Sequence, residues 1–212
     1  MRKSRIFKIA GFIMLAAAIG LAAVNRHTEK KAGEFSAAVI TELKKSVPEA
    51  KAEFSEEDVA LLLPEEIEYP DYVLNPFMDL PLVKIEDYEY CGTVSIPSLS
   101  IELPVINEWS YPALRVSPCR YEGTPYLNNM IICAHNYSTH FGEIKNLSIG
   151  EEIYFTDNEG NVFRYRVTEL ETLGPWDSDE MINGNYGLTL FTCTIGGRTR
   201  VVVRCEKHSN RI

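Results

Sequence analysis

The sequence of 212 residues predicts a mainly β fold, a barrel or a sandwich, behind an N-terminal transmembrane helix and a tether. Two observations carry this prediction. Short runs rich in β-branched and apolar residues recur between residues 92 and 205, and turn sequences such as Asp-Asn-Glu-Gly at 157–160 separate them. Ahead of these runs, a basic start is followed by a long apolar segment without charge.

Residues 1–26 are predicted to be a cytoplasmic basic tail and a membrane anchor. Four Lys or Arg residues precede the uncharged run Ile9–Val24, which is shorter than the roughly 20 residues of a usual spanning helix. The positive-inside rule keeps the basic end in the cytoplasm and places everything after Arg26 outside the cell. A cleaved signal peptide is the alternative, because the Ala-rich end of the run offers cleavage sites. We therefore expect a single-pass protein of the cell membrane with an extracellular domain.

The charge of the chain is uneven. The net charge of −9 combines a basic start, with seven Lys or Arg and one Glu in residues 1–31, and a remainder with 14 basic and 29 acidic residues. This balance argues against a nucleic-acid partner, which would need a basic face on the folded domain. The acidic remainder is typical of a domain exposed to solvent.

Residues 27–87 are predicted to form a juxtamembrane helix and an acidic tether. The segment Lys30–Ser46 has helix-forming composition and an apolar stripe. From residue 49 to residue 82 four prolines forbid regular structure, which indicates an extended tether or a strap across the domain. The residues of the apolar stripe, spaced by four, are Phe35, Val39 and Leu43.

The compact domain is predicted over residues 88–208. Its strands are short and separated by turn residues, and only small helical pieces are expected, at Tyr111–Arg115 and Phe141–Leu147. The predicted strands are Gly92–Ile96, Ile101–Ile106, Met130–Ala134, Glu152–Phe155, Val162–Leu170, Leu188–Cys193 and Arg200–Cys205.

Cys193 and Arg200 are expected to face each other at the open end of a hairpin. Two apolar runs flank a turn that contains Gly196 and Gly197, and antiparallel pairing of the runs puts the two Cα atoms roughly 5 Å apart. A cation there favours a thiolate and suits an oxyanion. A buried structural cysteine beside a surface arginine is the alternative.

His135 is the candidate partner for this cysteine. Of the four histidines, His27 adjoins the membrane segment and His208 lies in the C-terminal tail. His135 directly follows the apolar strand that ends at Ala134, where a rigid scaffold presents functional side chains. Cysteine, histidine and arginine at strand ends can supply a nucleophile, a general acid and base, and an oxyanion donor. His140 is the alternative histidine.

Three motifs, which follow one another along the chain in the same order as in the family, resemble the sortases, the cysteine transpeptidases of Gram-positive cell surfaces. "TLFTC" at 189–193 with "RVVV" from Arg200 matches the family's signature around its cysteine and arginine. Ala134-His135 matches the strand end that carries the family's histidine, although Gly is the common residue at the first position. "IPSLSIELPV" at 96–105 is similar to the opening strands. The likeness covers about residues 90–205.

The resemblance implies an eight-stranded β-barrel with the active site at one end. It implies that Cys193 attacks the Thr–Gly bond of an LPxTG-like sorting signal, that His135 transfers protons, and that Arg200 holds the oxyanion or the substrate backbone. The resulting thioester is resolved by an amine of peptidoglycan or of a pilin lysine. Thr192 and Ala134 are candidate substrate-binding residues. No cofactor and no metal ligand are expected.

Several alternatives stay open. Arg198 competes with Arg200 for its role. A papain-like peptidase is discounted, because its histidine would have to be His208, which lies close behind Cys193 in a polar tail. Asn75-Pro76-Phe77 resembles the lid tripeptide of pilus-type sortases with Asn in place of Asp, and we interpret residues 74–81 as a strap. A non-catalytic exported barrel that binds a partner is the alternative from another class. Specificity is expected in the loops at 107–129 and 171–187.

Two metal sites are alternatives to the expectation of no metal ligand, and the disulfide pairing is open. Five cysteines are an odd number, so at least one stays unpaired or pairs with another chain. Pairing is open among Cys91, Cys119, Cys133 and Cys205. The candidate zinc ligands are Cys133, His135, His140 and Cys205, and the candidate calcium ligands are Glu151, Glu152, Asp157 and Glu159.

Overall fold

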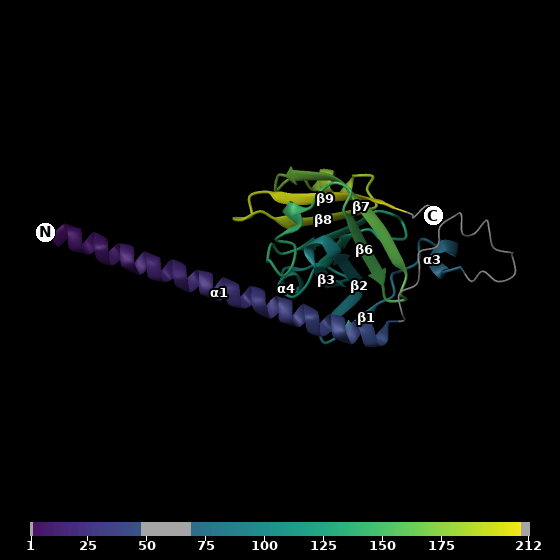
Figure 1. The fold of residues 1–212 in the computed structure, drawn as a ribbon, viewed down its shortest axis with the longest axis horizontal. Coiled ribbons are helices and arrows are strands. Elements are labelled where there is room, and N and C mark those ends of the chain that lie inside the picture. Colours follow the sequence, from purple (N-terminus) through teal and green to yellow (C-terminus); the bar gives the residue numbers. More distant parts are fainter. Residues whose placement is uncertain (1, 48–68, 209–212) are drawn as a thin grey trace.

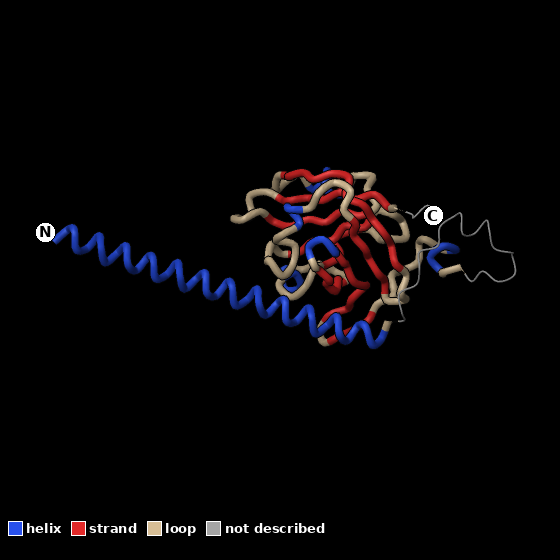
Figure 2. Tube along the Cα trace, viewed as in Figure 1, coloured by secondary structure: helices blue, strands red, loops and turns tan. Residues whose placement is uncertain are grey.

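A computed structural model describes residues 2–47 and 69–208, which form a β-barrel and one long helix that projects from it (Figure 1). The helices are α1 (Arg2–Ser46), α3 (Asp71–Leu74), α4 (Tyr111–Leu114) and α5 (Ser178–Ile182), with 3₁₀ turns η1 (Pro97–Leu99) and η2 (Ile144–Asn146). The strands are β1 (Val83–Ile85), β2 (Tyr88–Ile96), β3 (Ile101–Ile106), β4 (Cys119–Glu122), β5 (Met130–Ala134), β6 (Glu152–Asp157), β7 (Val162–Leu173), β8 (Leu188–Cys193) and β9 (Arg200–Lys207). Figure 2 shows the strands wrapping around a common interior.

Eight of these strands close into the predicted barrel. Their order is β2-β3-β4-β5-β8-β9-β7-β6, and pairing of β6 with β2 closes the ring. At the closure Gly92 has a φ of 152°, and a Cβ there would lie 2.2 Å from the carbonyl oxygen of Thr156, so this contact requires glycine. The seven predicted strands are all present, and β1 and β4 are two further strands that the sequence did not predict.

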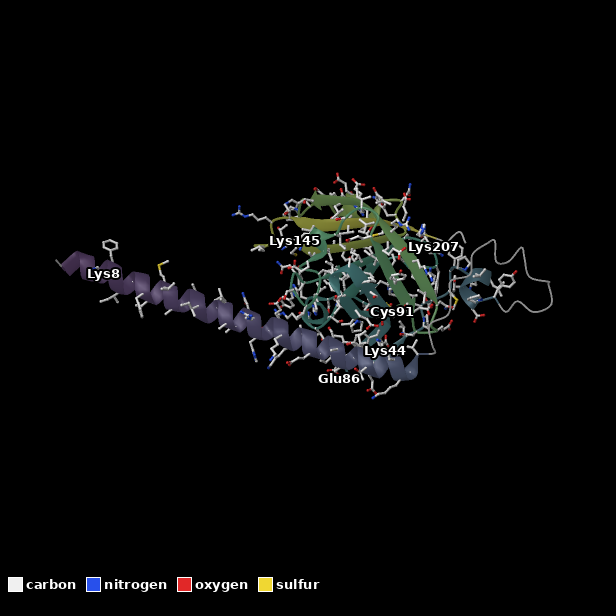
Figure 3. All side chains as sticks on the ribbon, viewed as in Figure 1. Lys8, Lys44, Glu86, Cys91, Lys145 and Lys207 are labelled. Carbon is white, nitrogen blue, oxygen red and sulfur yellow. The ribbon has the colours of Figure 1, made fainter. Side chains whose placement is uncertain are left out.

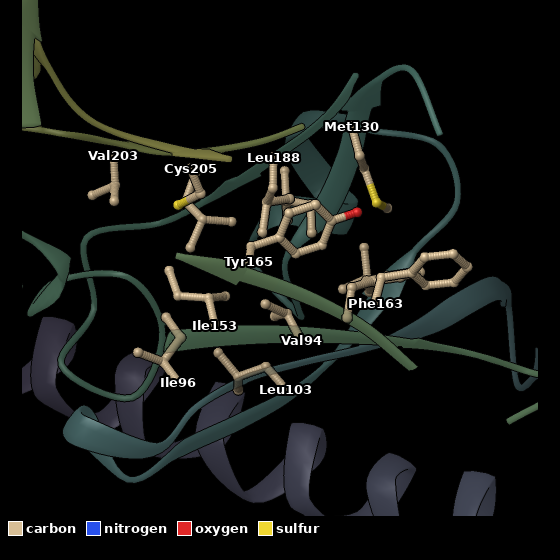
Figure 4. Close-up of a cluster of buried hydrophobic side chains, with 14 of the residues drawn as sticks. Val94, Ile96, Leu103, Met130, Ile153, Phe163, Tyr165, Leu188, Val203 and Cys205 are labelled. Atoms are coloured by element: carbon tan, nitrogen blue, oxygen red, sulfur yellow. The ribbon is translucent and has the colours of Figure 1, made fainter. Parts of the chain in front are cut away.

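The barrel interior is packed with apolar side chains. Along β7 the buried residues alternate, and Phe163, Tyr165 and Val167 point inward. Figure 4 shows Phe163 and Tyr165 among side chains from other strands of the ring, including Val94 and Leu188. Burial of such side chains stabilises the barrel by about 1.5–3 kcal/mol each. This rigid interior fixes the strand ends on which the candidate site lies.

Helix α1 is continuous from the apolar segment onto the barrel, whereas the sequence suggested a separate juxtamembrane helix. No proline and no strong breaker occurs where the apolar run ends, so the helix continues although the residues become polar. The predicted apolar stripe packs against the barrel, with Val39 and Leu43 buried against residues of β2 to β5. Ser36 and Ala32 are buried as well. The second half of α1 therefore belongs to the folded domain.

Residues 74–81 belong to a strap on the barrel, as interpreted from the sequence, and in the structure the strap extends over residues 69–82. Tyr72 and Leu80 are buried in the main core, and the ring of Tyr72 stacks on Tyr126 with centroids 4.9 Å apart. The strap lies at the end of the barrel opposite Cys193, where α3 is seen in Figure 1. It contributes no residue to the cavity around Cys193, so it is not a lid in this structure. The rest of the predicted acidic tether, residues 49–68, lies outside the described residues.

Candidate active site

Cys193 lies at the end of a central strand, with His135 on one side and Arg200 on the other. Strand β8 pairs with β9 in the antiparallel direction and places Cys193 opposite Arg200. On its other edge β8 pairs with β5 in the parallel direction and places Thr192 beside Ala134, so the next residues, Cys193 and His135, leave the barrel side by side. Neighbouring strands lie about 4.8 Å apart, so the backbone alone brings the three predicted residues together.

A cavity of about 230 Å³ opens at these strand ends, and all three residues line it. Its wall is rich in aromatic rings. Trp109 contacts Tyr121 with ring centroids 5.6 Å apart, and Tyr121 contacts Phe191 at 5.3 Å. Both loops that were expected to set specificity, 107–129 and 171–187, contribute to the lining. The cavity suits an extended peptide with apolar side chains.

The electrostatic surroundings of His135 favour its neutral form. Burial lowers the pKa of His135, and the nearby positive charge of Arg115 lowers it further. A neutral imidazole can accept a proton from a neighbouring thiol, which is the function that a general base requires. Arg115 is the C-terminal cap of α4 and was not singled out in the sequence, because no motif marks it.

Thr192 and Ala134 differ in their positions. Ala134 lines the cavity. Thr192 is buried, and its hydroxyl donates a hydrogen bond of 2.8 Å to the carbonyl oxygen of Ala134. This hydrogen bond joins the end of β8 to the end of β5, one residue before Cys193 and His135.

Arg200 and Arg198 are two positions apart, but their side chains have different surroundings. Arg200 lines the cavity, and its Nη1 donates hydrogen bonds of 3.1 Å to the carbonyl oxygens of Gly197 and Thr199. Arg198 is exposed and contributes nothing to the cavity wall. The geometry thus favours Arg200 as the cation beside Cys193.

Arg204 holds one wall of the cavity and was missed in the sequence analysis. Its side chain is only 2% exposed, and its Nε donates a hydrogen bond of 2.7 Å to Glu171. Its two Nη atoms donate to the carbonyl oxygens of Met181 and Glu180, at 3.0 and 2.8 Å. These carbonyls belong to α5, which lines the cavity, so Arg204 fixes α5 to the barrel.

His140 is buried completely. Its ring packs against Tyr137, which packs against His135, with centroids 5.4 and 4.9 Å apart. Neither ring nitrogen has a hydrogen-bond partner among the described residues. Burial and then the proximity of His135 lower the pKa of His140 to about 4, against a smaller opposing effect of Glu29. His140 is therefore neutral and enclosed, which favours His135 as the proton-transfer group.

We expect His140 to make the protein sensitive to acid. Its folded pKa of about 4 lies below the value of 6.5 for an unperturbed histidine, so the unfolded chain binds the proton first as the pH falls. The free energy of unfolding should decrease below about pH 6.5, and by about 3 kcal/mol at about pH 4. Urea unfolding of residues 27–212 across this range measures the decrease. The variant His140→Leu loses no hydrogen bond and should remove most of it, whereas an unchanged decrease would contradict the assignment.

All five cysteines are free thiols, and four of them are buried. Burial raises the pKa of Cys91, Cys119 and Cys205 to about 12 and also raises the pKa of Cys133, so these thiols are held in the neutral form. Cys193 is half-buried and lines the cavity. Cys133 also lines the cavity but is buried, so Cys193 is the more accessible of these two thiols.

In the described part of the chain, the candidate zinc and calcium ligands do not come together as a metal site. No group of three or more His, Cys, Asp or Glu side chains there could hold a metal ion. Of the candidate zinc ligands, Cys205 lies in the cluster inside the barrel and Cys133 in the cluster beneath α1. Of the candidate calcium ligands, Asp157 is buried and accepts hydrogen bonds from amides of the following turn.

Comparisons of sequence and fold agree on one family. A family model described as the sortase domain matches residues 94–208, more than half of the chain. Sortase A of Bacillus anthracis is 26% identical over 206 residues, which cover 91% of this chain and 89% of that protein. Sortase C from Clostridium perfringens SM101 has a similar structure, with 26% identity and a TM-score of 0.50 over 68% of this chain and 77% of that one. A Clostridium perfringens sortase C solved with the C-terminal cell wall sorting motif shares the fold, with 23% identity and a TM-score of 0.53 over 73% and 95% of the two chains.

Proposed function

Because the chain belongs to the sortase family of cysteine transpeptidases, we propose that Cys193, His135 and Arg200 are its catalytic residues. The observation that carries the proposal is the position of Cys193 between His135 and Arg200 on adjacent strands, in one cavity. This arrangement combines a reachable thiol, a neutral imidazole and a fixed cation.

The first half of the proposed reaction cleaves the Thr–Gly bond of an LPxTG-like sorting signal. The sulfur of Cys193 attacks the threonine carbonyl carbon while His135 accepts the thiol proton. Arg200 donates hydrogen bonds to the oxyanion of the tetrahedral intermediate. His135 then protonates the leaving amide nitrogen, the C–N bond breaks, and a thioester remains on Cys193.

In the second half an amine takes the place of the departed glycine. The amine nitrogen attacks the thioester carbon, His135 accepts its proton, and that proton returns to the sulfur of Cys193 as the C–S bond breaks. The aromatic wall of the cavity supports this outcome, because it limits access of water to the thioester. We propose an amine of peptidoglycan or of a pilin as the acceptor.

The proposed organisation of the chain follows the same premise. Residues 1–26 form a cytoplasmic tail and a membrane anchor, residues 27–87 connect it to the barrel, and residues 88–208 form the catalytic domain. One helix of the described chain, within Phe7–Ser46, is long and apolar enough to cross a membrane. This supports a single-pass protein of the cell membrane with its catalytic domain outside.

Intact-mass spectrometry tests the proposed function. Residues 27–212, incubated with a pool of LPxTG-like peptides, should gain the mass of the acyl fragment up to threonine, and a glycine amine should discharge this adduct faster than water does. The variant Cys193→Ala should gain no mass. A reactive Cys193 that forms no adduct with any peptide would contradict an LPxTG-like substrate, and an unreactive Cys193 would favour the non-catalytic alternative.

We expect Arg200→Met to lower kcat/KM for peptide cleavage by roughly 10²- to 10³-fold, because one oxyanion donor is lost. Arg200→Lys keeps the charge but not the paired donors of the guanidinium, so it should recover only part of the activity. Steady-state kinetics with a fluorogenic sorting peptide measures both. The matched control is Arg198→Met, two residues away and outside the cavity, which should stay near the native rate. If Arg198→Met lowered kcat/KM more than Arg200→Met does, Arg198 would be the oxyanion donor instead of Arg200.

A further inference from the structure

Helix α1 reaches the barrel within a few residues of its apolar segment. The apolar run ends at Val24, and the first barrel contact comes at Glu29, whose carboxylate accepts a hydrogen bond from the backbone amide of Ser138. The hydroxyl of Thr139 donates a hydrogen bond of 3.2 Å to the carbonyl oxygen of Glu29. At Gly33 an added Cβ would lie 2.9 Å from Thr139 Cγ2, so helix and loop are in close contact.

This spacing leaves little room between the bilayer and the barrel. Five helical residues from Val24 to Glu29 span about 7.5 Å. The headgroup region on each side of a bilayer is about 5–8 Å thick. Because α1 has no break and is buried against the barrel from Ala32 onward, it cannot act as a flexible tether. The loop at 137–139 is therefore held at the level of the headgroups.

The end of the barrel that faces the bilayer is the end that holds the cavity. The loop at 137–139 follows His135 directly, so it leaves the barrel beside Cys193. In Figure 1 the hairpin between β8 and β9 points toward the apolar part of α1. Figure 3 shows Lys145 at this end and Lys207 at the opposite end.

Large apolar side chains are exposed to solvent at this end of the described chain. Ile195, two residues after Cys193, is 92% exposed, and Trp176, between two residues that line the cavity, is 88% exposed. Tyr111, on the cavity wall, is 74% exposed. Trp and Tyr are enriched where proteins meet the membrane–water interface. On α1, Arg26 lies between the apolar run and the first barrel contact at Glu29, and Lys30 directly follows that contact, so both can contact lipid phosphates.

We propose that the catalytic end of the barrel rests on the outer face of the bilayer, with Ile195 and Trp176 in the lipid interface. The proposal rests on the membrane anchor proposed above. The catalytic end of the barrel is then a second membrane-binding surface of the protein, in addition to the spanning helix. The cavity opens beside the membrane surface. A substrate that is itself held at the lipid surface reaches Cys193 without leaving that surface.

Fluorescence quenching by brominated lipid tests the proposal. The full chain is inserted in phosphatidylcholine and phosphatidylglycerol vesicles, and its emission is compared with that of Trp176→Phe, so that the difference reports Trp176. Bromine on the upper acyl chain should quench Trp176 strongly. The matched control adds Phe77→Trp to Trp176→Phe, which moves the indole to an exposed site on the strap at the far end of the barrel. That indole should not be quenched.

A second variant tests the role of the rigid helix. A Gly-Ser linker of about 12 residues after Arg26 should reduce the quenching of Trp176 while the chain stays in the vesicles. Flotation with the vesicles reports the anchor separately, and Cys193→Ala should be quenched like the native chain, so a failure of catalysis is distinguished from a failure of docking. A floated chain with unquenched Trp176 would overturn the proposal, and a chain that does not float would overturn the anchor on which it rests.

Discussion

Replacement of His135 by Gln should lower kcat/KM for peptide cleavage by roughly 10²- to 10⁴-fold, the usual contribution of a positioned acid and base. The physical reason is the backbone geometry, which places His135 beside Cys193 at the ends of two paired strands. The thiol itself stays in place, so alkylation should still modify Cys193 in the variant. Single-turnover acylation, followed by mass, measures the loss.

The matched control for this prediction is His140→Gln, which changes the same residue type five positions away. His140 is enclosed and does not line the cavity, so its replacement should alter stability more than the acylation rate. The pH profile provides a second check. Because the pKa of His135 is lowered, the acid limb of kcat/KM should fall below about pH 6.5, and a limb above that value would contradict a neutral imidazole as the base.

Replacement of Arg204 by Met should destabilise the protein by about 3–5 kcal/mol, because it breaks a buried ion pair and leaves polar partners without donors. The partners are the carboxylate of Glu171 and the carbonyl oxygens of Glu180 and Met181. Since the two carbonyls belong to α5, the cavity wall should also loosen, and KM for the peptide should rise at temperatures where the variant is still folded. Urea unfolding and kinetics below the melting transition measure the two effects.

Arg166 on the neighbouring strand β7 is the matched control. Its ion pair with Glu152 is 3.5 Å long, and its side chain is 42% exposed. Arg166→Met should therefore cost no more than about 1 kcal/mol. A similar loss of stability in both variants would show that the buried contacts of Arg204 stabilise the protein no more than the exposed ion pair of Arg166 does.

Most of the barrel could be predicted, because strands such as Val162–Leu173 alternate between buried and half-exposed residues and end at clear turns. The strands that were missed lack this signal. Val83–Ile85 has three residues, and Cys119–Glu122 carries two charged side chains. The continuity of α1 was missed because a change from apolar to polar residues was interpreted as a structural boundary. A change in polarity alone does not end a helix, and no proline interrupts α1 at this point.

The candidate site could be predicted in part. The pairing of Cys193 with Arg200 follows directly from the register of the hairpin, because the two residues are close in sequence. The position of His135 beside Cys193 depends on a parallel pairing between strands more than 50 residues apart, which no local pattern predicts. Its prediction therefore depended on the family resemblance and on the location of His135 at the end of a strand. The aromatic wall and Arg204 come from packing of separate loops, for which no local pattern exists.

The two strand pairings that meet on β8 also determine where the chain can change in length. A deletion or insertion within Leu188–Cys193 would shift the register by one and turn each inward side chain outward, so the thiol would move away from both neighbours. Gly196 and Gly197 have positive φ and no atom within 4 Å of an added Cβ. Residues added between them would lengthen the hairpin loop without moving Cys193 relative to Arg200. Length variation among homologous chains, and any engineered peptide insertion, should therefore concentrate at this glycine pair.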